Sequence, residues 1–117
     1  FNGVCTNKSN FVVLNNVDSG DKIDLLAFAA TTFNSTKITL SVGATESTQA
    51  YLDQAMTVLS QGQVGWFQYN GNTYVTADVA NNANSFVDGT DFVVMITGLK
   101  DLSAASFNTT TGTLEIA

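Results

Sequence analysis

The sequence contains no histidine, no proline and a single cysteine, and these absences exclude several kinds of chemistry. Histidine is the commonest general base and a common zinc ligand, and without it neither a Ser-His-Asp nor a Cys-His catalytic set can form. Cys5 has no partner within the chain for a disulfide bond. The sequence also contains neither a P-loop nor a G-x-G-x-x-G motif. We therefore expect a protein that is not an enzyme.

Charged residues are scarce as well: they make up only 12% of the chain, about half the usual share. Four basic residues against ten acidic ones give a net charge of −6, so neither nucleic acid nor an anionic membrane surface is an expected partner. No apolar run approaches the roughly 18 residues that a membrane span needs, so no transmembrane segment is predicted. The polar surface must be built from Asn, Thr, Ser, Gln and Gly. Such surfaces are common in extracellular β-proteins and in proteins that pack into arrays.

What is present is organised around residues 64–78, which predict a β-hairpin. Two runs rich in aromatic and β-branched residues flank Asn70-Gly71. A type I′ turn needs φ > 0 at both central positions, and Asn-Gly is its strongest sequence signal. Because an isolated hairpin is marginally stable in water, a third strand must pair with it, and Phe92–Ile96 is the obvious candidate.

A helix is predicted over about residues 46–60, because the apolar residues there follow the helical period. They are Leu52, Ala55, Met56 and Leu59. Thr45 or Ser47 is expected to cap the start of this helix, and Gly62 its end. The helix is expected to cover one face of a sheet.

Further short strands are predicted from apolar or alternating runs. A buried strand is expected at Phe11–Leu14, a half-buried one at Lys37–Val42 with Ile38, Leu40 and Val42 on one face, and a last one at Thr113–Ala117. An apolar segment covers Ile23–Phe28, residues 31–36 are expected to form a loop, and residues 100–107 one helical turn. The predicted fold is mainly β with one covering α-helix, an antiparallel sheet or sandwich built around the Asn-Gly hairpin, in a single domain over residues 1–117.

Two groups of acidic residues are candidates for calcium ligands. Asp18, Asp21 and Asp24 are spaced by three residues around Gly20. The second group lies in or beside a long loop and consists of Asp78, Asn82, Asn84, Asp88 and Asp91. Calcium takes six to eight oxygen ligands from carboxylates, amides and backbone carbonyls in flexible loops. Neither group matches an EF-hand or the glycine-rich nonapeptide of a calcium β-roll. The alternative is that these side chains satisfy their own backbone as turns, and both interpretations stay open.

The aromatic residues of the hairpin are the one candidate for ligand stacking. Trp66, Phe67, Tyr69 and Tyr74 would suit a carbohydrate-binding platform, and they would equally suit a hydrophobic core.

Several segments resemble known secreted proteins. Residues 17–28, VDSGDKIDLLAF, resemble the segment that follows the calcium β-roll in serralysin-type secreted proteins. The segments GNTYV at 71–75, FVDGTD at 86–91, VMITGL at 94–99 and DLS at 101–103 are similar, in this order, to the C-terminal region of RTX-type bacterial surface-layer proteins.

The resemblance implies the C-terminal domain of a larger protein that a type I, ATP-driven exporter secretes. Such exporters read an uncleaved signal in the last several tens of residues, which is poor in charge and proline and often ends in a few apolar residues after an acid. The ending Leu114, Glu115, Ile116 and Ala117 fits that description. The β-roll itself would lie before Phe1.

We therefore expect a non-enzymatic, extracellular domain of an RTX-like S-layer or surface protein, acting in secretion and in folding or packing at the cell surface. Its expected partners are the type I exporter and either further copies in a surface lattice or the upstream domains of its parent. Calcium is the only cofactor suggested. The alternatives are the non-catalytic tail of a serralysin-like protease, an adhesin or carbohydrate-binding module, and a structural domain whose resemblance is accidental.

Overall fold

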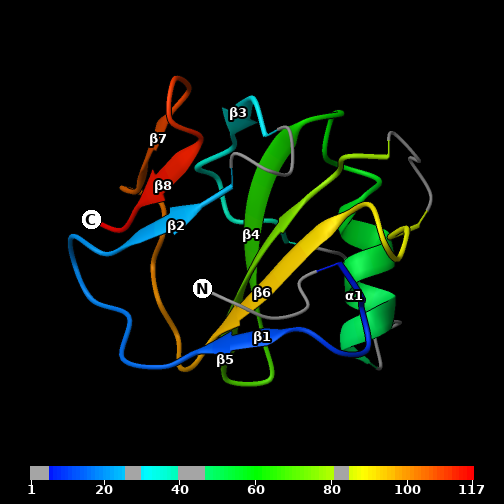
Figure 1. The fold of residues 1–117 in the computed structure, drawn as a ribbon. Helices are drawn as coiled ribbons and strands as arrows, with labels where there is room; N and C mark the ends of the chain where they lie inside the picture. The colour runs from blue at the N-terminus through cyan, green and yellow to red at the C-terminus, as the bar shows by residue number, and fades with distance from the viewer. Residues whose placement is uncertain (1–5, 26–29, 40–46, 81–84) are drawn as a thin grey trace.

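The computed structural model describes residues 6–25, 30–39, 47–80 and 85–117. Within these residues the protein is mainly β, with one short helix, one five-stranded mixed sheet and one three-stranded antiparallel sheet (Figure 1). The mainly-β prediction with a single helix is therefore confirmed.

The predicted Asn-Gly hairpin is present at the centre of the larger sheet. Strand β4 (Gln63–Tyr69) pairs antiparallel with β5 (Asn72–Ala77). Asn70 and Gly71 both have positive φ, 51° and 84°, which is the backbone that a type I′ turn requires. This turn sets the register, so that Phe67 lies opposite Tyr74 and Trp66 opposite Val75.

Strand β6 (Phe92–Ile96) extends the hairpin, as predicted, by pairing antiparallel with β5. The other two strands are parallel to their neighbours: β1 (Val12–Leu14) to β6, and β3 (Thr32–Phe33) to β4. The order is β1-β6-β5-β4-β3. The expectation of an antiparallel sheet is wrong here, because strand direction depends on where a distant segment enters the sheet and leaves no trace in a three-residue pattern.

The two parallel strands also correct two local predictions. The apolar run of β1 was expected to be buried, but β1 is an edge strand and Val13 is 45% exposed. Residues 31–36, expected to be a loop, contain β3. Both segments are too short for periodicity to distinguish strand from loop or edge from centre.

The smaller sheet joins β2, from the N-terminal part of the chain, to two strands at the C-terminal end. Strand β2 (Lys22–Asp24) pairs with β8 (Thr113–Glu115), and β8 pairs with β7 (Ser106–Asn108). The last strand is confirmed. The helical turn predicted for 100–107 is wrong: a tight turn, in which the Ala105 N–H donates to the Leu102 carbonyl, leads into β7. Pairing with β8 satisfies the backbone there.

Helix α1 (Thr48–Ala55) is present but shorter than the predicted 46–60. Ser47 is its N-cap, and its hydroxyl accepts a hydrogen bond from the Ala50 N–H at 3.1 Å. After Ala55 the chain tightens into turns, so the helix ends before Leu59, although that side chain stays buried. Gly62 does not cap the helix; its N–H donates to the Asp78 carbonyl at 2.6 Å.

The half-buried strand predicted over 37–42 is not formed by its described part, residues 37–39. Ile38 is nevertheless buried, and its N–H donates to the Trp66 carbonyl at 2.8 Å, so this segment lies along β4. Leu40 and Val42 lie outside the described residues, as do the alternative cap Thr45 and residues 26–28 of the apolar segment.

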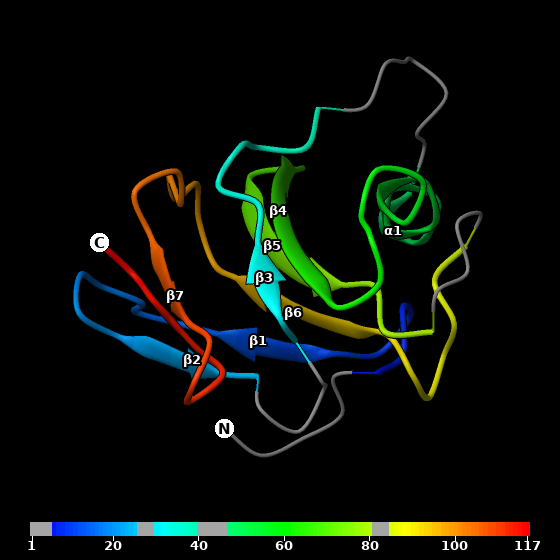
Figure 2. The same cartoon turned by 90° about the horizontal axis from the view of Figure 1, so that it is seen from above.

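The elements form three layers, with the larger sheet in the middle (Figure 2). The smaller sheet packs on one face of the larger sheet and α1 packs on the other. The sheet-side core consists of Val17, Ile23, Leu25, Val64, Trp66, Val75, Ala77, Phe92, Val94, Ile96, Leu102, Leu114 and Ile116. The helix-side core consists of Ile38, Leu52, Ala55, Met56, Leu59, Phe67, Tyr74, Phe86 and Val93.

Candidate functional site

In the first predicted acidic group, Asp18 and Asp21 form a turn before β2, and Asp24 is the last residue of β2. The Asp18 N–H donates to the Asp21 carboxylate at 2.8 Å, and the Asp21 N–H donates to the Asp18 carbonyl at 3.1 Å. Gly20, between them, has a φ of 93°, which a residue with a side chain rarely adopts. Asp18, Asp21 and Asp24 are all exposed.

The second acidic group lies in the loop before β6. Asp91 is fully buried, and its Oδ1 accepts hydrogen bonds from the backbone N–H groups of Val79 and Ala80 at 2.7 and 2.8 Å. Its Oδ2 accepts one from the Val87 N–H at 2.8 Å. This carboxylate therefore ties the exit of β5 to the entrance of β6. Asp88 is exposed and accepts a hydrogen bond from the Lys8 N–H at 3.0 Å.

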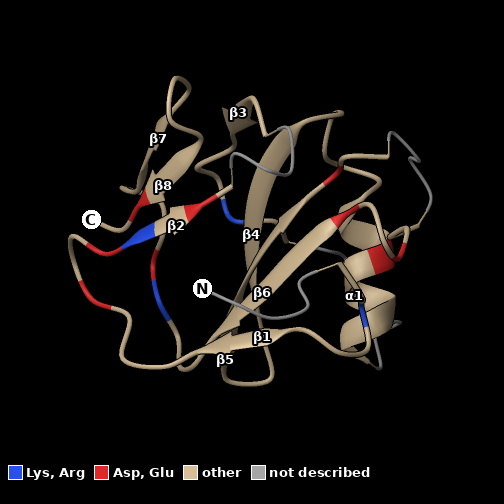
Figure 3. Ribbon diagram, in the orientation of Figure 1, with Lys and Arg blue, Asp and Glu red and all other residues tan. Residues whose placement is uncertain are grey.

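The structure keeps the two groups apart. Acidic residues lie on and beside β2 and β8, and separately around α1 and the start of β6 (Figure 3). Within the described parts of the chain, no three His, Cys, Asp or Glu residues are grouped so that they could hold a metal ion. Calcium binding by Asp18, Asp21, Asp24, Asp88 or Asp91 stays a prediction.

The terminal motif is part of the smaller sheet. Leu114 and Ile116 are buried, whereas Glu115 and Ala117 are exposed. The Ile116 carbonyl accepts a hydrogen bond from the Gly20 N–H at 2.7 Å, and the Ile116 N–H donates to the Asp21 carbonyl at 2.8 Å. The last residues are thus held against the turn that precedes β2.

The hairpin aromatics do not form a common surface. Tyr51 stacks on Phe67, and Phe67 stacks on Tyr74, with ring centroids 4.3 and 5.0 Å apart on the helix side. Tyr69 also lies on that face, 5.4 Å from Tyr51. Trp66 projects from the opposite face of β4, because successive strand residues alternate. Trp66 lines an open hollow, and this hollow is the candidate site.

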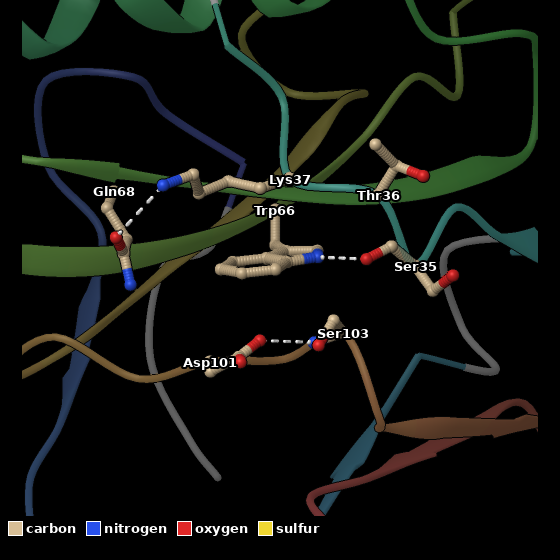
Figure 4. Close-up of a pocket in the computed structure, with 7 residues that line it drawn as sticks. All are labelled: Ser35, Thr36, Lys37, Trp66, Gln68, Asp101 and Ser103. Carbon is tan, nitrogen blue, oxygen red and sulfur yellow. Dashed lines mark hydrogen bonds between the residues drawn. The ribbon is translucent and has the colours of Figure 1, made fainter.

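The Trp66 hollow has a volume of about 520 Å³. Its floor is Trp66 and Gln68 from β4, one wall is the segment 35–37, and the other wall is Asp101 and Ser103. In Figure 4 the indole ring lies between the Lys37 side chain and the turn formed by Asp101 and Ser103.

Hydrogen bonds hold the floor of the Trp66 hollow in place. The indole Nε1–H of Trp66 donates to the Ser35 carbonyl at 2.9 Å. The Gln68 side-chain nitrogen donates to the Lys100 carbonyl at 2.9 Å, and its oxygen lies 3.4 Å from Lys37 Nζ. Both walls are therefore attached to β4, one through Trp66 and the other through Gln68.

The Asp101 wall follows from a turn that the sequence encodes. Asp101 accepts a hydrogen bond from the Ser103 N–H at 2.9 Å. The Ser103 hydroxyl, this backbone N–H and the charge of Lys37 lower the pKa of Asp101 below its usual value of 3.8. Thr73 anchors the preceding residues, because its hydroxyl oxygen accepts from the Lys100 N–H at 2.7 Å.

The prediction of stacking aromatics named Trp66 but missed the residues around it. Gln68 was recognisable as the next residue on the same face of β4, and Asp101-x-Ser103 as a turn. Lys37 and its neighbours left no such signal, because their position depends on how the segment after β3 returns along β4.

Comparisons with known proteins leave the family of this chain open: no protein-family model matches it, and no curated protein sequence matches it. Among the described residues, the helix is too short and too polar to cross a membrane.

Proposed function

We propose that this chain is the non-enzymatic C-terminal domain of an RTX-like S-layer or other surface protein, which acts in type I secretion and then in folding or packing outside the cell. The proposal rests on the ordered resemblance of the segments between Gly71 and Ser103.

One observation carries the proposal: the segments that match the family pattern contain residues on which the loops of this fold depend. Gly71, Gly89 and Gly98 all have positive φ, at 84°, 88° and 90°. Asp91, the last residue of the FVDGTD segment, is the buried carboxylate that accepts three backbone N–H groups. These residues close the loops around β5 and β6, and their occurrence in the order of the family pattern is what supports the proposal.

The secretion role is supported by the composition of the chain end. Residues 102–117 contain a single charged residue, Glu115, followed by an apolar and a small residue. The exporter must recognise this segment while it is unfolded, which requires that β8 is not yet paired with β2 and β7. The pairing of β8 with β2 joins segments far apart in sequence and is therefore slow to form, and this delay favours recognition before folding.

Export is tested by fusing the whole chain behind a passenger protein in cells that carry a type I exporter of RTX proteins. We expect secretion of the unaltered fusion and strongly reduced secretion of Leu114→Ser. The matched control is Leu52→Ser, because Leu52 is equally buried but lies far from the chain end. Failure to secrete the unaltered fusion, or equal loss in both variants, would contradict the proposed role.

Calcium is the cofactor that the resemblance suggests, and a thermal melt of the chain with calcium and with a chelator tests it. A ligand that binds only the folded state raises Tm by mass action. A rise that Asp24→Asn abolishes would assign calcium to the group of Asp18, Asp21 and Asp24, and a rise that Asp88→Asn abolishes would assign it to the loop before β6. An unchanged Tm would leave these acids as turn-forming residues only.

Packing in a lattice is tested by the concentration dependence of the particle size. The charge-poor surface would present Asn, Thr and Ser side chains for polar contacts between copies. We expect size-exclusion chromatography to show reversible growth of the particles as concentration rises. A monomer at all concentrations would restrict the role of this domain to secretion.

A further inference from the structure

The Trp66 hollow combines features that suit a small polar ligand. Its volume of about 520 Å³ lies within the range of roughly 300–1,000 Å³ that is usual for small-molecule sites. Apart from the indole, the groups that line it are hydroxyls, an amide, an ammonium and a carboxylate. The side chains of both walls are exposed, so their polar groups can exchange hydrogen bonds to water for hydrogen bonds to a polar ligand.

We propose that the Trp66 hollow binds one neutral sugar residue. This goes beyond the proposed secretion role and does not depend on it, because the residues concerned lie outside the terminal motif and can be altered separately.

The charges around the hollow favour a ligand without net charge. Lys37 and Asp101 stand on opposite walls, and their formal charges cancel. An anion such as a phosphate or a uronic acid would meet Asp101, and a cation would meet Lys37. A sugar avoids both penalties, because each hydroxyl can donate to the carboxylate and accept from the ammonium.

The hydrogen-bonding groups also match a sugar. Asp101 uses part of its acceptor capacity on Ser103, but an ionised carboxylate offers about four lone-pair sites. The hydroxyls of Ser35, Thr36 and Ser103 can each donate and accept, as sugar hydroxyls do. Such a mixed set discriminates poorly between individual hexoses, so we commit to neutral hexoses and N-acetylhexosamines as the class.

Trp66 forms the floor of the site rather than an open stacking platform. Its side chain is only 2% exposed, and the bond from Nε1 to the Ser35 carbonyl holds its orientation. A ring held in place loses little conformational freedom when a ligand contacts it. The ring is also the only tryptophan of the chain, so the tryptophan fluorescence of the protein arises from this one position.

The test is a fluorescence titration of the intact chain with glucose, galactose, mannose and N-acetylglucosamine, repeated by calorimetry. We expect a saturable change with at least one of these sugars. Sorbitol, an open-chain polyol, controls for solvent effects and should give no saturable change. Glucuronate is the charge control and should bind at least tenfold more weakly than glucose.

Two substitutions locate the binding. Asp101→Asn keeps the oxygen that accepts from the Ser103 N–H, and Lys37→Met keeps most of the aliphatic stem, so neither should disturb the fold. Each should weaken sugar binding at least tenfold. Asp88→Asn is the matched control: it removes the same charge from another exposed loop, keeps the oxygen that accepts from Lys8, and should leave affinity unchanged.

Three results would overturn the proposal. They are the absence of saturable binding with all four sugars in both methods, sugar binding that survives both Asp101→Asn and Lys37→Met unchanged, and tighter binding of glucuronate than of glucose. None of them bears on secretion, which the fusion experiment decides separately.

Discussion

The two faces of the central sheet are covered in different ways. The helix-side core is drawn from a middle stretch of the chain, Ile38 to Val93, and its centre is the aromatic stack of Tyr51, Phe67 and Tyr74. The sheet-side core depends on both ends of the chain, because residues 17–25 and 102–116 supply the cover over β4, β5 and β6.

This difference shows why one face was easier to predict than the other. The helix side follows from patterns within single segments: a helical period, a capping serine and an Asn-Gly turn. The sheet side depends on β2 meeting β8, whose partners Lys22 and Glu115 are distant in sequence. Such pairing costs loop-closure entropy before the burial of apolar side chains compensates that cost. The sequence of a short strand also does not specify which strand it pairs with.

The largest expected effects come from truncating the centre of each core. Phe67→Ala should lower the free energy of unfolding by about 3–5 kcal/mol, because Phe67 is fully buried between two rings. Leu114→Ala, on the sheet side, should lower it by about 2–5 kcal/mol. Urea denaturation measures both.

The same variants show whether the two faces unfold together. Trp66 fluorescence reports the sheet side and near-ultraviolet circular dichroism of the tyrosines reports mainly the helix side. We expect the two probes to give coincident transitions, since both cores share β4, β5 and β6. Separate transitions in Leu114→Ala would mean that the smaller sheet detaches as an independent unit.

A smaller effect is expected at Gly65, which lies close to Leu59 and Ile38 on the helix side. A Cβ atom at Gly65 would lie 2.7 Å from Leu59 Cδ2 and 2.9 Å from Ile38 Cδ1. Gly65→Ala should therefore destabilise the protein by about 1–3 kcal/mol in a thermal or urea melt. Adding Leu59→Ala removes the nearest methyl groups, so the double variant should be less destabilised than the sum of the two single variants. Simple additivity would argue against this close contact.

Ser47→Ala tests the N-terminal cap of α1, a local interaction on the helix side. Loss of the hydrogen bond from the Ala50 N–H to the Ser47 hydroxyl should cost about 1 kcal/mol, measured by chemical denaturation. Ser47→Asn is the control, because asparagine is an equally good N-cap and should preserve stability. A loss in both variants would mean that Ser47 matters for reasons other than capping.

The smallest effect concerns how the free energy of unfolding falls at low pH because of Asp101, on the sheet side. The Ser103 hydrogen bonds, and more weakly Lys37, lower the pKa of Asp101 in the folded protein. The stabilisation from this carboxylate is therefore present above its unfolded pKa and is lost as the pH falls through the lower folded value. Urea melts of the wild type and Asp101→Asn should differ slightly near neutral pH and converge in strong acid. A constant difference at all pH values would contradict this assignment.

The candidate site was predictable in part, for the same reason as the fold. Trp66 and Gln68 share a face of β4 by simple alternation, and Asp101 with Ser103 forms a turn whose sequence signals it. Lys37 belonged to a segment expected to continue as a strand, yet residues 37–39 form no strand, although the Ile38 N–H donates to the Trp66 carbonyl of β4. Its place opposite Asp101 arises from packing and has no local signature.

The sequence by itself determined the features that rest on local backbone preferences. These are the type I′ turn at Asn70-Gly71, the helix capped by Ser47, and the strands β4, β5, β6 and β8. Tertiary structure alone decided the parallel pairing of β1 and β3, the conversion of a predicted helical turn into β7, and the assembly of the Trp66 hollow. Turns and helices are stabilised by neighbours within a few residues, whereas strand direction and partners are settled only when distant segments bury a common core.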